Sequence, residues 1–233
     1  MQYEDYYVVN KNRMVKSIRG SLKSLRKILN KYYDTAFASE VIEKVSCIFE
    51  ELLPKLPYIG GMDNLLTKQI VNTAPYLALY KVLKSKNIEI TQIGKIIYDS
   101  SVEYWNSYPK LIRIFIRKYL KSRGYLKVLK SSAIKSFERK YSGDFVFSSV
   151  DTDKEHFDYG IDYFECGICK YFHEHDADEI MPYICLCDFA SSDALKTGLS
   201  RTKTIAEGND KCDFRFKIGQ KVDRDLSVYF KNV

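Results

Sequence analysis

The sequence contains no run of about 18 apolar residues, the length at which a helix begins to span a membrane. Its first residues, MQYEDYYVVNKNRMVKS, also lack the apolar stretch of a signal peptide. We therefore expect a cytoplasmic protein without a membrane partner. In that compartment the six cysteines should be free thiols or metal ligands, because cytosolic reductants keep disulfides reduced.

Phosphate-binding loops and complete metal-binding motifs are also missing. The glycines nearest to polar clusters are isolated and form no phosphate loop: Gly160, Gly167 and Gly208. Residues 166–169, CGIC, have the spacing of one metal knuckle, but Cys185 and Cys187 are separated by one residue and would diverge on a helix. A tetrahedral zinc site is then two ligands short, unless His173 and His175 complete it. We expect no metal and no cofactor.

Positive charge is concentrated in the first part of the chain. Residues 1–143 contain 26 Lys and Arg against 12 Asp and Glu, a net charge of +14. Residues 144–233 contain 11 against 18, a net charge of −7. The basic residues recur at helical spacing without a nucleic-acid-binding motif, which is typical of solvated helix faces. We expect no nucleic-acid partner. The basic part can instead dock on the acidic part of the chain or on another subunit, so the sequence leaves a homo-oligomer open.

Apolar residues recur every three or four positions from about Lys11 to Lys140, which predicts five or six packed helices. Two of the stripes are Ile18, Leu22, Leu25, Ile28 and Leu29, and Val41, Val45, Ile48, Phe49 and Leu52. Pro109 should begin a further helix, with the apolar face Ile112, Phe115, Ile116 and Tyr119.

The pattern changes after Gly143. The segments DFVFSSV, DYGIDYFECGICKYF, SRTKTIAEG and KCDFRFKIG have the alternating, aromatic and β-branched character of strands. Between them, ADEIMPYICLCDFASSDALKTG predicts a helix that begins between about Asp178 and Pro182 and is stopped by Gly198. The fold class is therefore α+β: an N-terminal helical bundle (1–143) packs with a C-terminal antiparallel sheet that carries an inserted helix (144–233). No linker is visible, so we expect one composite domain.

The last two strands predict a hairpin that turns at EGNDK. One register places opposite charges face to face, and it pairs Glu207 with Lys211, Ala206 with Cys212, Thr204 with Phe214, and Thr202 with Phe216. Because strand side chains alternate, Cys212 then points toward the core or a pocket, whereas Arg201 lies on the opposite face.

The inserted helix brings a thiol and a carboxylate together. Cys185 and Asp188 are three residues apart and share a face, while Cys187 projects to the other side. A plain alternative is that Asp188 bonds to nearby backbone and that the cysteines are small core residues. A carboxylate on an apolar helix is costly unless it is paired or used. We therefore predict that Cys185, Asp188 and Cys212 meet in one site between this helix and the hairpin.

The segments ECGICKYF, CLCDFA and RTKTIAEGNDKCDFRF together resemble the L-2-amino-thiazoline-4-carboxylic acid hydrolase family. The resemblance covers about residues 145–217 and is weak over the N-terminal helices. The residues that match the family's marked positions are Cys166, Cys185, Asp188, Arg201, Thr202, Thr204, Gly208, Cys212 and Phe214. The same strand, helix and strand order is similar to small-molecule-binding domains related to 4-vinyl reductases, whose members can bind a ligand without turnover.

The resemblance implies a hydrolase that opens a cyclic amidine, 2-aminothiazoline-4-carboxylate, at a carbon–nitrogen bond to give N-carbamoyl-cysteine. Two alternatives stay open: a binding or sensor domain that uses the same pocket, and a helical interaction protein whose cysteine cluster is incidental. Hydrolysis of an amidine needs a nucleophile or activated water, a carboxylate for the cationic amidine and a cation for the substrate carboxylate.

The sequence offers each of these groups. We assign Cys212 or Cys185 as the nucleophile, Asp188 as the amidinium partner and proton shuttle, and Arg201 as the carboxylate clamp. The hairpin register counts against Arg201, because it sends that side chain away from Cys212 unless a bulge intervenes. The other residues expected to contact substrate are Cys166, Thr202, Thr204 and Phe214.

Overall fold

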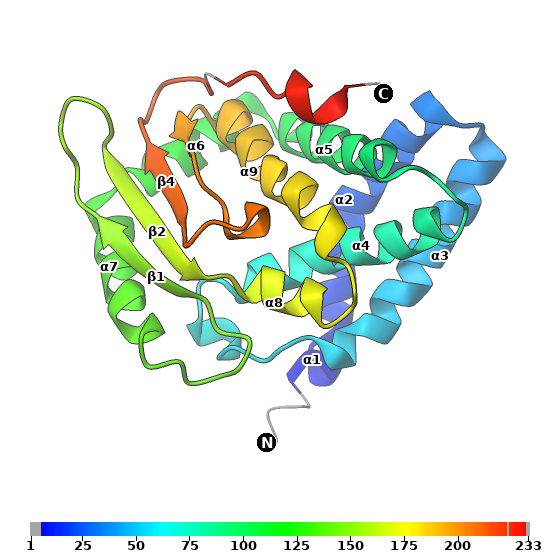
Figure 1. Ribbon diagram of the computed structural model, residues 1–233, viewed down its shortest axis with the longest axis horizontal. Helices are drawn as coiled ribbons and strands as arrows, with labels where there is room; N and C mark the ends of the chain where they lie inside the picture. The colour runs from blue at the N-terminus through cyan, green and yellow to red at the C-terminus, as the bar shows by residue number, and fades with distance from the viewer. Residues whose placement is uncertain (1–5, 223, 232–233) are drawn as a thin grey trace.

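The computed structural model describes residues 6–222 and 224–231. The described chain begins with helices α1 (Tyr6–Val9), α2 (Lys11–Tyr32), α3 (Thr35–Leu52), α4 (Thr67–Lys84), α5 (Ile90–Ser107), α6 (Lys110–Leu120) and α7 (Arg123–Ser136). The strands are β1 (Val146–Val150), β2 (Tyr159–Glu165), β3 (Leu199–Ser200) and β4 (Cys212–Phe216), with α8 (Gly167–His173) and α9 (Met181–Leu195) inserted between β2 and β3. Figure 1 shows the sheet at one end, with α8 and α9 between it and helices α2–α5. The α+β prediction is confirmed.

The N-terminal helices form where their apolar stripes can be buried together. Most residues of the two predicted stripes on α2 and α3 are buried, and only Leu22 and Ile48 are partly exposed. The Asp34 side chain accepts a hydrogen bond from Phe37 N at 2.8 Å and so caps the start of α3. No helix among the described residues is long and apolar enough to cross a membrane.

Helices α4 and α9 have buried residues on several sides, which places them in the interior of the fold. Helix α9 crosses α5 at Gly94, where a Cβ atom would lie only 2.3 Å from the Tyr183 ring. Glycine therefore permits an approach that any larger residue would obstruct. This close crossing fixes α9, and the residues it carries, against the N-terminal helices.

The described strands form one antiparallel sheet in the order β1-β2-β4-β3. Between β2 and β4, Tyr163 lies opposite Cys212 and Ile161 opposite Phe214. These side chains share one face because strand residues alternate, and that face joins the main core. The opposite face carries Asp162, whose carboxylate accepts hydrogen bonds from a lysine and an arginine.

The helical region and the sheet region contribute to the same core. One continuous cluster of buried side chains includes Leu77 of α4 and Ile96 of α5 together with Ile161 of β2, Phe172 of α8 and Ile184 of α9. Since the cluster crosses residue 143, the core of each region is completed by the other.

The strand predicted through CGICKYF ends earlier than expected. Strand β2 stops at Glu165, and residues 167–173 form helix α8. The pairing explains the change, because β1 has its last partner at Glu165 and β4 has its last partner at Tyr163. Beyond that point the backbone has no strand to pair with and satisfies its hydrogen bonds within a helix, beginning with Lys170 N to the Cys166 carbonyl at 3.0 Å.

The predicted hairpin register is wrong over residues 201–206. Strand β3 contains only Leu199 and Ser200, which pair with Phe216 and Arg215. The following backbone leaves the sheet because the Asp213 carboxylate accepts hydrogen bonds from the backbone N–H groups of Thr202 and Lys203. Residues 205–207 then form a short 3-10 turn instead of a strand. Cys212 is nevertheless buried, in agreement with the prediction that it points toward the core or a pocket.

Helix α6 begins after Pro109 as predicted, but its apolar face is not covered. None of its residues is buried, and Phe115 is 76% exposed and Tyr119 is 54% exposed. The helix contacts the C-terminal end of α9, where Arg113 Nη1 lies 3.5 Å from the Ala194 carbonyl oxygen.

Candidate functional site

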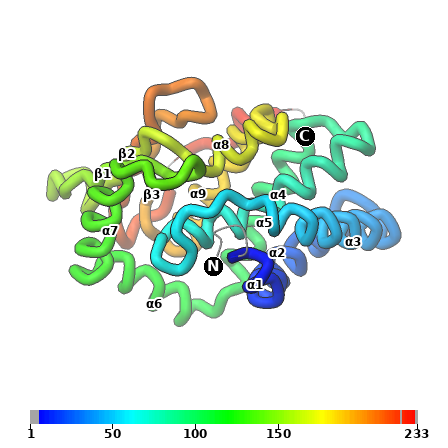
Figure 2. The backbone as a smooth tube through the Cα atoms, turned by 90° about the horizontal axis from the view of Figure 1, so that it is seen from below, coloured from blue at the N-terminus to red at the C-terminus, as the bar shows by residue number. Residues whose placement is uncertain are grey.

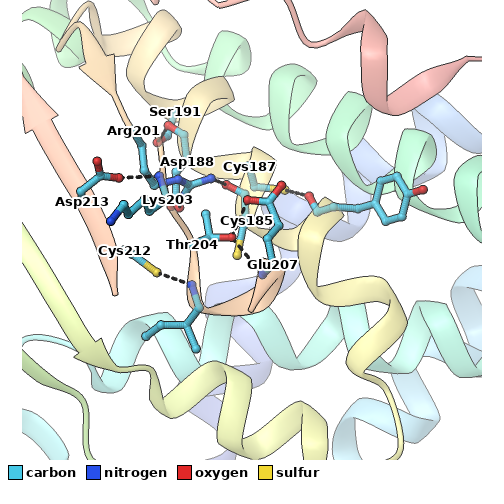
Figure 3. Close-up of polar contacts among 12 residues, drawn as sticks. Cys185, Cys187, Asp188, Ser191, Arg201, Lys203, Thr204, Glu207, Cys212 and Asp213 are labelled. Carbon is cyan, nitrogen blue, oxygen red and sulfur yellow. Dashed lines mark hydrogen bonds and ion pairs between the residues drawn. The ribbon is translucent and has the colours of Figure 1, made fainter. Parts of the chain in front are cut away.

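Helix α9 presents Cys185 and Asp188 on one side, as their spacing predicts. Cys187 projects elsewhere: its sulfur lies 4.0 Å from the Tyr183 carbonyl oxygen, and burial raises its pKa to about 12. Figure 3 shows Asp188 turned toward the segment that follows β3. Asp188 is therefore the charged group that α9 presents to this segment.

Arg201 reaches this side of α9 from the end of β3. Its Nη1 donates to Asp188 Oδ2 at 2.7 Å, and its Nη2 donates to the Cys185 carbonyl oxygen at 3.0 Å. The guanidinium lies between the rings of Phe189 and Phe214, 4.9 and 5.0 Å from their centroids. Arg201 is only 4% exposed, so the expectation that it faces away from the site is wrong. The departure of residues 201–204 from the sheet turns the side chain inward.

Asp188 is both accessible and surrounded by protein. Its side chain is 47% exposed, yet burial is the main influence on its pKa, which rises above the ordinary value although Arg201 opposes the rise. Arg201 occupies Oδ2, and no described residue donates a hydrogen bond to Oδ1. One carboxylate oxygen is therefore free to accept from a ligand.

Besides Cys187, three thiols lie within electrostatic reach of Asp188: Cys166, Cys185 and Cys212. Burial raises the pKa of Cys185 well above its ordinary value and that of Cys212 to about 11. The Cys212 sulfur also accepts a hydrogen bond from Ile205 N at 3.2 Å. Both of these thiols therefore stay protonated near neutral pH.

Cys166 differs from the other two thiols. It is half-buried at the junction of β2 and α8. Its pKa is lowered, chiefly because the Cys169 thiol donates to it, and the amides of Cys169 and Ile168 add to the effect against the opposing influence of burial. Among the three thiols near Asp188, Cys166 is the one that ionises most readily.

Sequence reasoning missed Tyr163. This residue lies on β2 opposite Cys212, and its ring packs against Phe214 at 5.4 Å between centroids. Burial raises its pKa well above the ordinary value, and Tyr125, Asp188 and Cys166 raise it further. The phenol therefore keeps its proton beside the cluster. Pairing KCDFRF with DYGIDYF, instead of with RTKTIAEG as the predicted hairpin has it, would have placed Tyr163 there.

Thr202 and Thr204, which were predicted to contact substrate, stabilise the loop after β3 through hydrogen bonds instead of lining the thiol cluster. The Thr202 hydroxyl donates to Asp213 Oδ2 at 2.6 Å, and Thr202 is exposed. Thr204 is buried, and its hydroxyl donates to Glu207 Oε2 at 2.7 Å. Of the predicted site residues, the structure brings together Cys166, Cys185, Asp188, Arg201, Cys212 and Phe214, and it leaves Thr202 outside.

The histidines lie apart from this cluster. His173 ends α8 and contacts Asp178 at 2.9 Å, while the His175 ring packs edge-on against Tyr171. Over residues 6–222 and 224–231, no group of three or more His, Cys, Asp or Glu side chains is arranged to hold a metal ion. Cavities of about 790 and 370 Å³ lie against α2–α3 and between α7 and the β1–β2 edge, and neither is lined by residues of the cluster.

Comparison with known families identifies the chain. The profile of the L-2-amino-thiazoline-4-carboxylic acid hydrolase family matches residues 69–216. The chain belongs to this family. The match extends upstream of the resemblance seen in the sequence and includes α4–α7, so these helices are part of the family's fold. Neither a curated protein nor a solved structure matches the chain.

Proposed function

We propose that this family member hydrolyses a small cyclic amidine that carries a carboxylate, such as 2-aminothiazoline-4-carboxylate. The observation that carries the proposal is the half-accessible Asp188, which Arg201 holds through Oδ2 while Oδ1 accepts no hydrogen bond from a described residue. A protonated amidine offers N–H donors to such an oxygen. Family membership supplies the reaction class.

The product decides which bond must break. Adding water to 2-aminothiazoline-4-carboxylate gives N-carbamoyl-cysteine only if the ring carbon keeps both nitrogens and loses sulfur. The carbon–sulfur bond therefore breaks, and not the carbon–nitrogen bond expected from the resemblance. The ring sulfur leaves as a thiolate that takes up a proton, and the oxygen of water becomes the carbonyl oxygen.

Cys166 is the best candidate for the attacking group, in place of Cys185 or Cys212, because its pKa is lowered whereas burial raises theirs. Its thiolate attacks the amidine carbon and expels the ring thiolate, which leaves an amidino group on Cys166. Water then attacks the same carbon, Cys166 leaves, and the urea of N-carbamoyl-cysteine is formed. Asp188 holds the cationic amidine, passes one amidinium proton to the departing ring thiolate, and accepts the proton that the attacking water loses.

Arg201 has a different role from the predicted carboxylate clamp. Both of its Nη groups are occupied, by Asp188 and by the Cys185 carbonyl. In this proposal it is a positioning residue that fixes the Asp188 carboxylate and leaves Oδ1 directed toward the ligand.

The first test is hydrolysis by Asp188→Asn. The change keeps the shape of the side chain but removes the charge, so turnover should fall by on the order of 100-fold, as for other lost acid–base groups. N-carbamoyl-cysteine is measured by mass spectrometry. The matched control is Asp193→Asn, an exposed carboxylate on the same helix, which should hydrolyse at the wild-type rate.

Unchanged hydrolysis by Asp188→Asn would remove Asp188 from the mechanism. If the wild type opens no ring but its melting temperature rises with 2-aminothiazoline-4-carboxylate, the site binds without turnover, as the alternative from the sequence holds.

A further inference from the structure

Helix α6 exposes a continuous apolar stripe. Leu111, Phe115 and Tyr119 are four residues apart and so lie on one side of the helix, and they are 78%, 76% and 54% exposed. Ile112 borders the stripe and is also exposed. Figure 2 shows α6 at the periphery of the molecule, next to α7. Burying such a stripe against the body would stabilise the fold, yet the described part of the chain leaves it exposed.

The charge around this stripe has one sign. Residues 110–140 contain 11 Lys and Arg against one acidic residue, Glu138. Lys110, Lys118 and Lys121 are exposed and border the stripe on one side, and none of them forms an ion pair with a described residue. The helix therefore presents an apolar strip beside a row of free cations, which is the composition of helices that lie in a membrane interface.

We propose that the outer face of α6 docks on an anionic lipid surface. At about 1.5 Å per residue, α6 is about 16 Å long, so it can lie flat, with Leu111 and Phe115 among the acyl chains and the lysines among the headgroups. From the sequence we expect no membrane partner because no segment is long and apolar enough to span a bilayer. Docking on the surface of a membrane does not require such a segment. This inference does not depend on the proposed hydrolysis.

Two other occupants fit the charges less well. Nucleic acid would pair with the lysines through its phosphates but would leave Phe115 and Leu111 in water. A second copy placed by two-fold symmetry would bring the same cationic row against itself. An anionic lipid layer satisfies the apolar stripe and the cations together.

The test is flotation of the full chain with vesicles of phosphatidylcholine, alone or with about 30% phosphatidylserine. We expect the wild type to float with the anionic vesicles only, and binding to weaken as salt rises from about 0.05 to about 0.3 M. Phe115→Ser should lower the partition coefficient at least tenfold, by about the transfer free energy of one buried Phe side chain. Lys118→Gln with Lys121→Gln should lower it about 30-fold, which corresponds to about 1 kcal/mol for each cation.

Matched controls separate this face from general surface effects. Val9→Ser changes an apolar residue of similar exposure on α1, and Lys23→Gln removes an exposed cation from α2; both should bind like the wild type. All of these variants should melt at the wild-type temperature, because the side chains are exposed. Absence of binding to anionic vesicles, or unchanged binding of Phe115→Ser, would overturn the proposal. So would a dimer in sedimentation equilibrium that Phe115→Ser dissociates, because a second copy would then occupy the face.

Discussion

Arg201 combines a buried charge, two hydrogen bonds and two aromatic contacts in one side chain. Its carbonyl oxygen in turn accepts a hydrogen bond from Arg224 Nη1 at 2.7 Å. Such a cation is stable in the interior only while Asp188 neutralises it. The same pair favours the ionised form of Asp188 against the burial that raises its pKa, so the electrostatics of the candidate site depend on both partners.

Arg201→Met tests this dependence. The change keeps an apolar side chain between the rings but leaves Asp188 without its cation, and we expect a loss of about 3 kcal/mol in the free energy of unfolding at neutral pH, at the lower end of the range for broken buried pairs because Asp188 is half-accessible. Urea unfolding measures the loss, and the exposed Arg19→Met should change stability by less than about 0.5 kcal/mol.

The loss should also depend on pH. Burial raises the pKa of Asp188, and removal of Arg201 raises it further. As pH falls through this raised pKa, Asp188 takes up a proton and no longer needs a cation, so the stability difference between wild type and Arg201→Met should shrink. A difference that stays constant or grows toward low pH would contradict the pairing.

Cys166 should alkylate at lower pH than Cys212. The pKa of Cys166 is lowered, whereas burial raises that of Cys212 to about 11, and the thiolate is the reactive form. Iodoacetamide labelling of the folded protein across a pH series, read by peptide mass spectrometry, gives a rate profile for each thiol. The midpoint for Cys166 should lie below that for Cys212, and the reverse order would return the nucleophile to the pair first assigned from the sequence.

Helix α9 positions the site through its crossing with α5. A Cβ atom at Gly94 would overlap the Tyr183 ring, because it would lie only 2.3 Å from the nearest ring atoms. Gly94→Ala should therefore destabilise the fold by about 1–3 kcal/mol and lower hydrolysis, because α9 carries Asp188. In the control Gly124→Ala, the new Cβ would meet only Ser122 Oγ at 3.9 Å, so denaturant unfolding should show little change or a small gain from helix propensity. Equal effects at both glycines would contradict a tight crossing.

Local patterns predicted the helices and the main strands, and contacts between distant segments decided the rest. The spacing of Cys185 and Asp188 was sufficient to place them on one face of α9, because helical geometry is local. The loop after β3 was mispredicted, since Asp213 captures the Thr202 and Lys203 amides from the neighbouring strand. The alternating sequence of this loop fits a strand, but alternation alone does not reveal that Asp213 will bind these two amides.

The position of Arg201 follows from the same loop. As a strand residue it would point away from Cys212, but the loop turns it toward Asp188. Tyr163 was missed for a related reason, because its place opposite Cys212 depends on β2 pairing with β4, about 50 residues further along the chain. The site thus combines one predictable helix with two pairings that only the folded chain defines.

At the scale of the whole molecule, the site lies where the helical region and the sheet region meet. Helix α9 packs on α5, β4 supplies Cys212, and the C-terminal segment closes over the loop through Tyr229, whose hydroxyl donates to Glu207 at 2.8 Å. The core cluster that joins the regions contains residues of α2–α5 and of α7–α9. Neither region could unfold without exposing apolar surface of the other.

We therefore predict that residues 1–143 and 144–233 unfold as one cooperative unit. The single tryptophan, Trp105 on α5, reports on the helical region by fluorescence, and the buried Cys212 reports on the sheet region by its reaction with a thiol reagent during a brief pulse. In a urea series the two probes should give the same midpoint, which should also coincide with the loss of helical circular dichroism. If Cys212 becomes reactive at lower urea than the Trp105 transition, the sheet region unfolds separately, and the prediction of one composite domain fails.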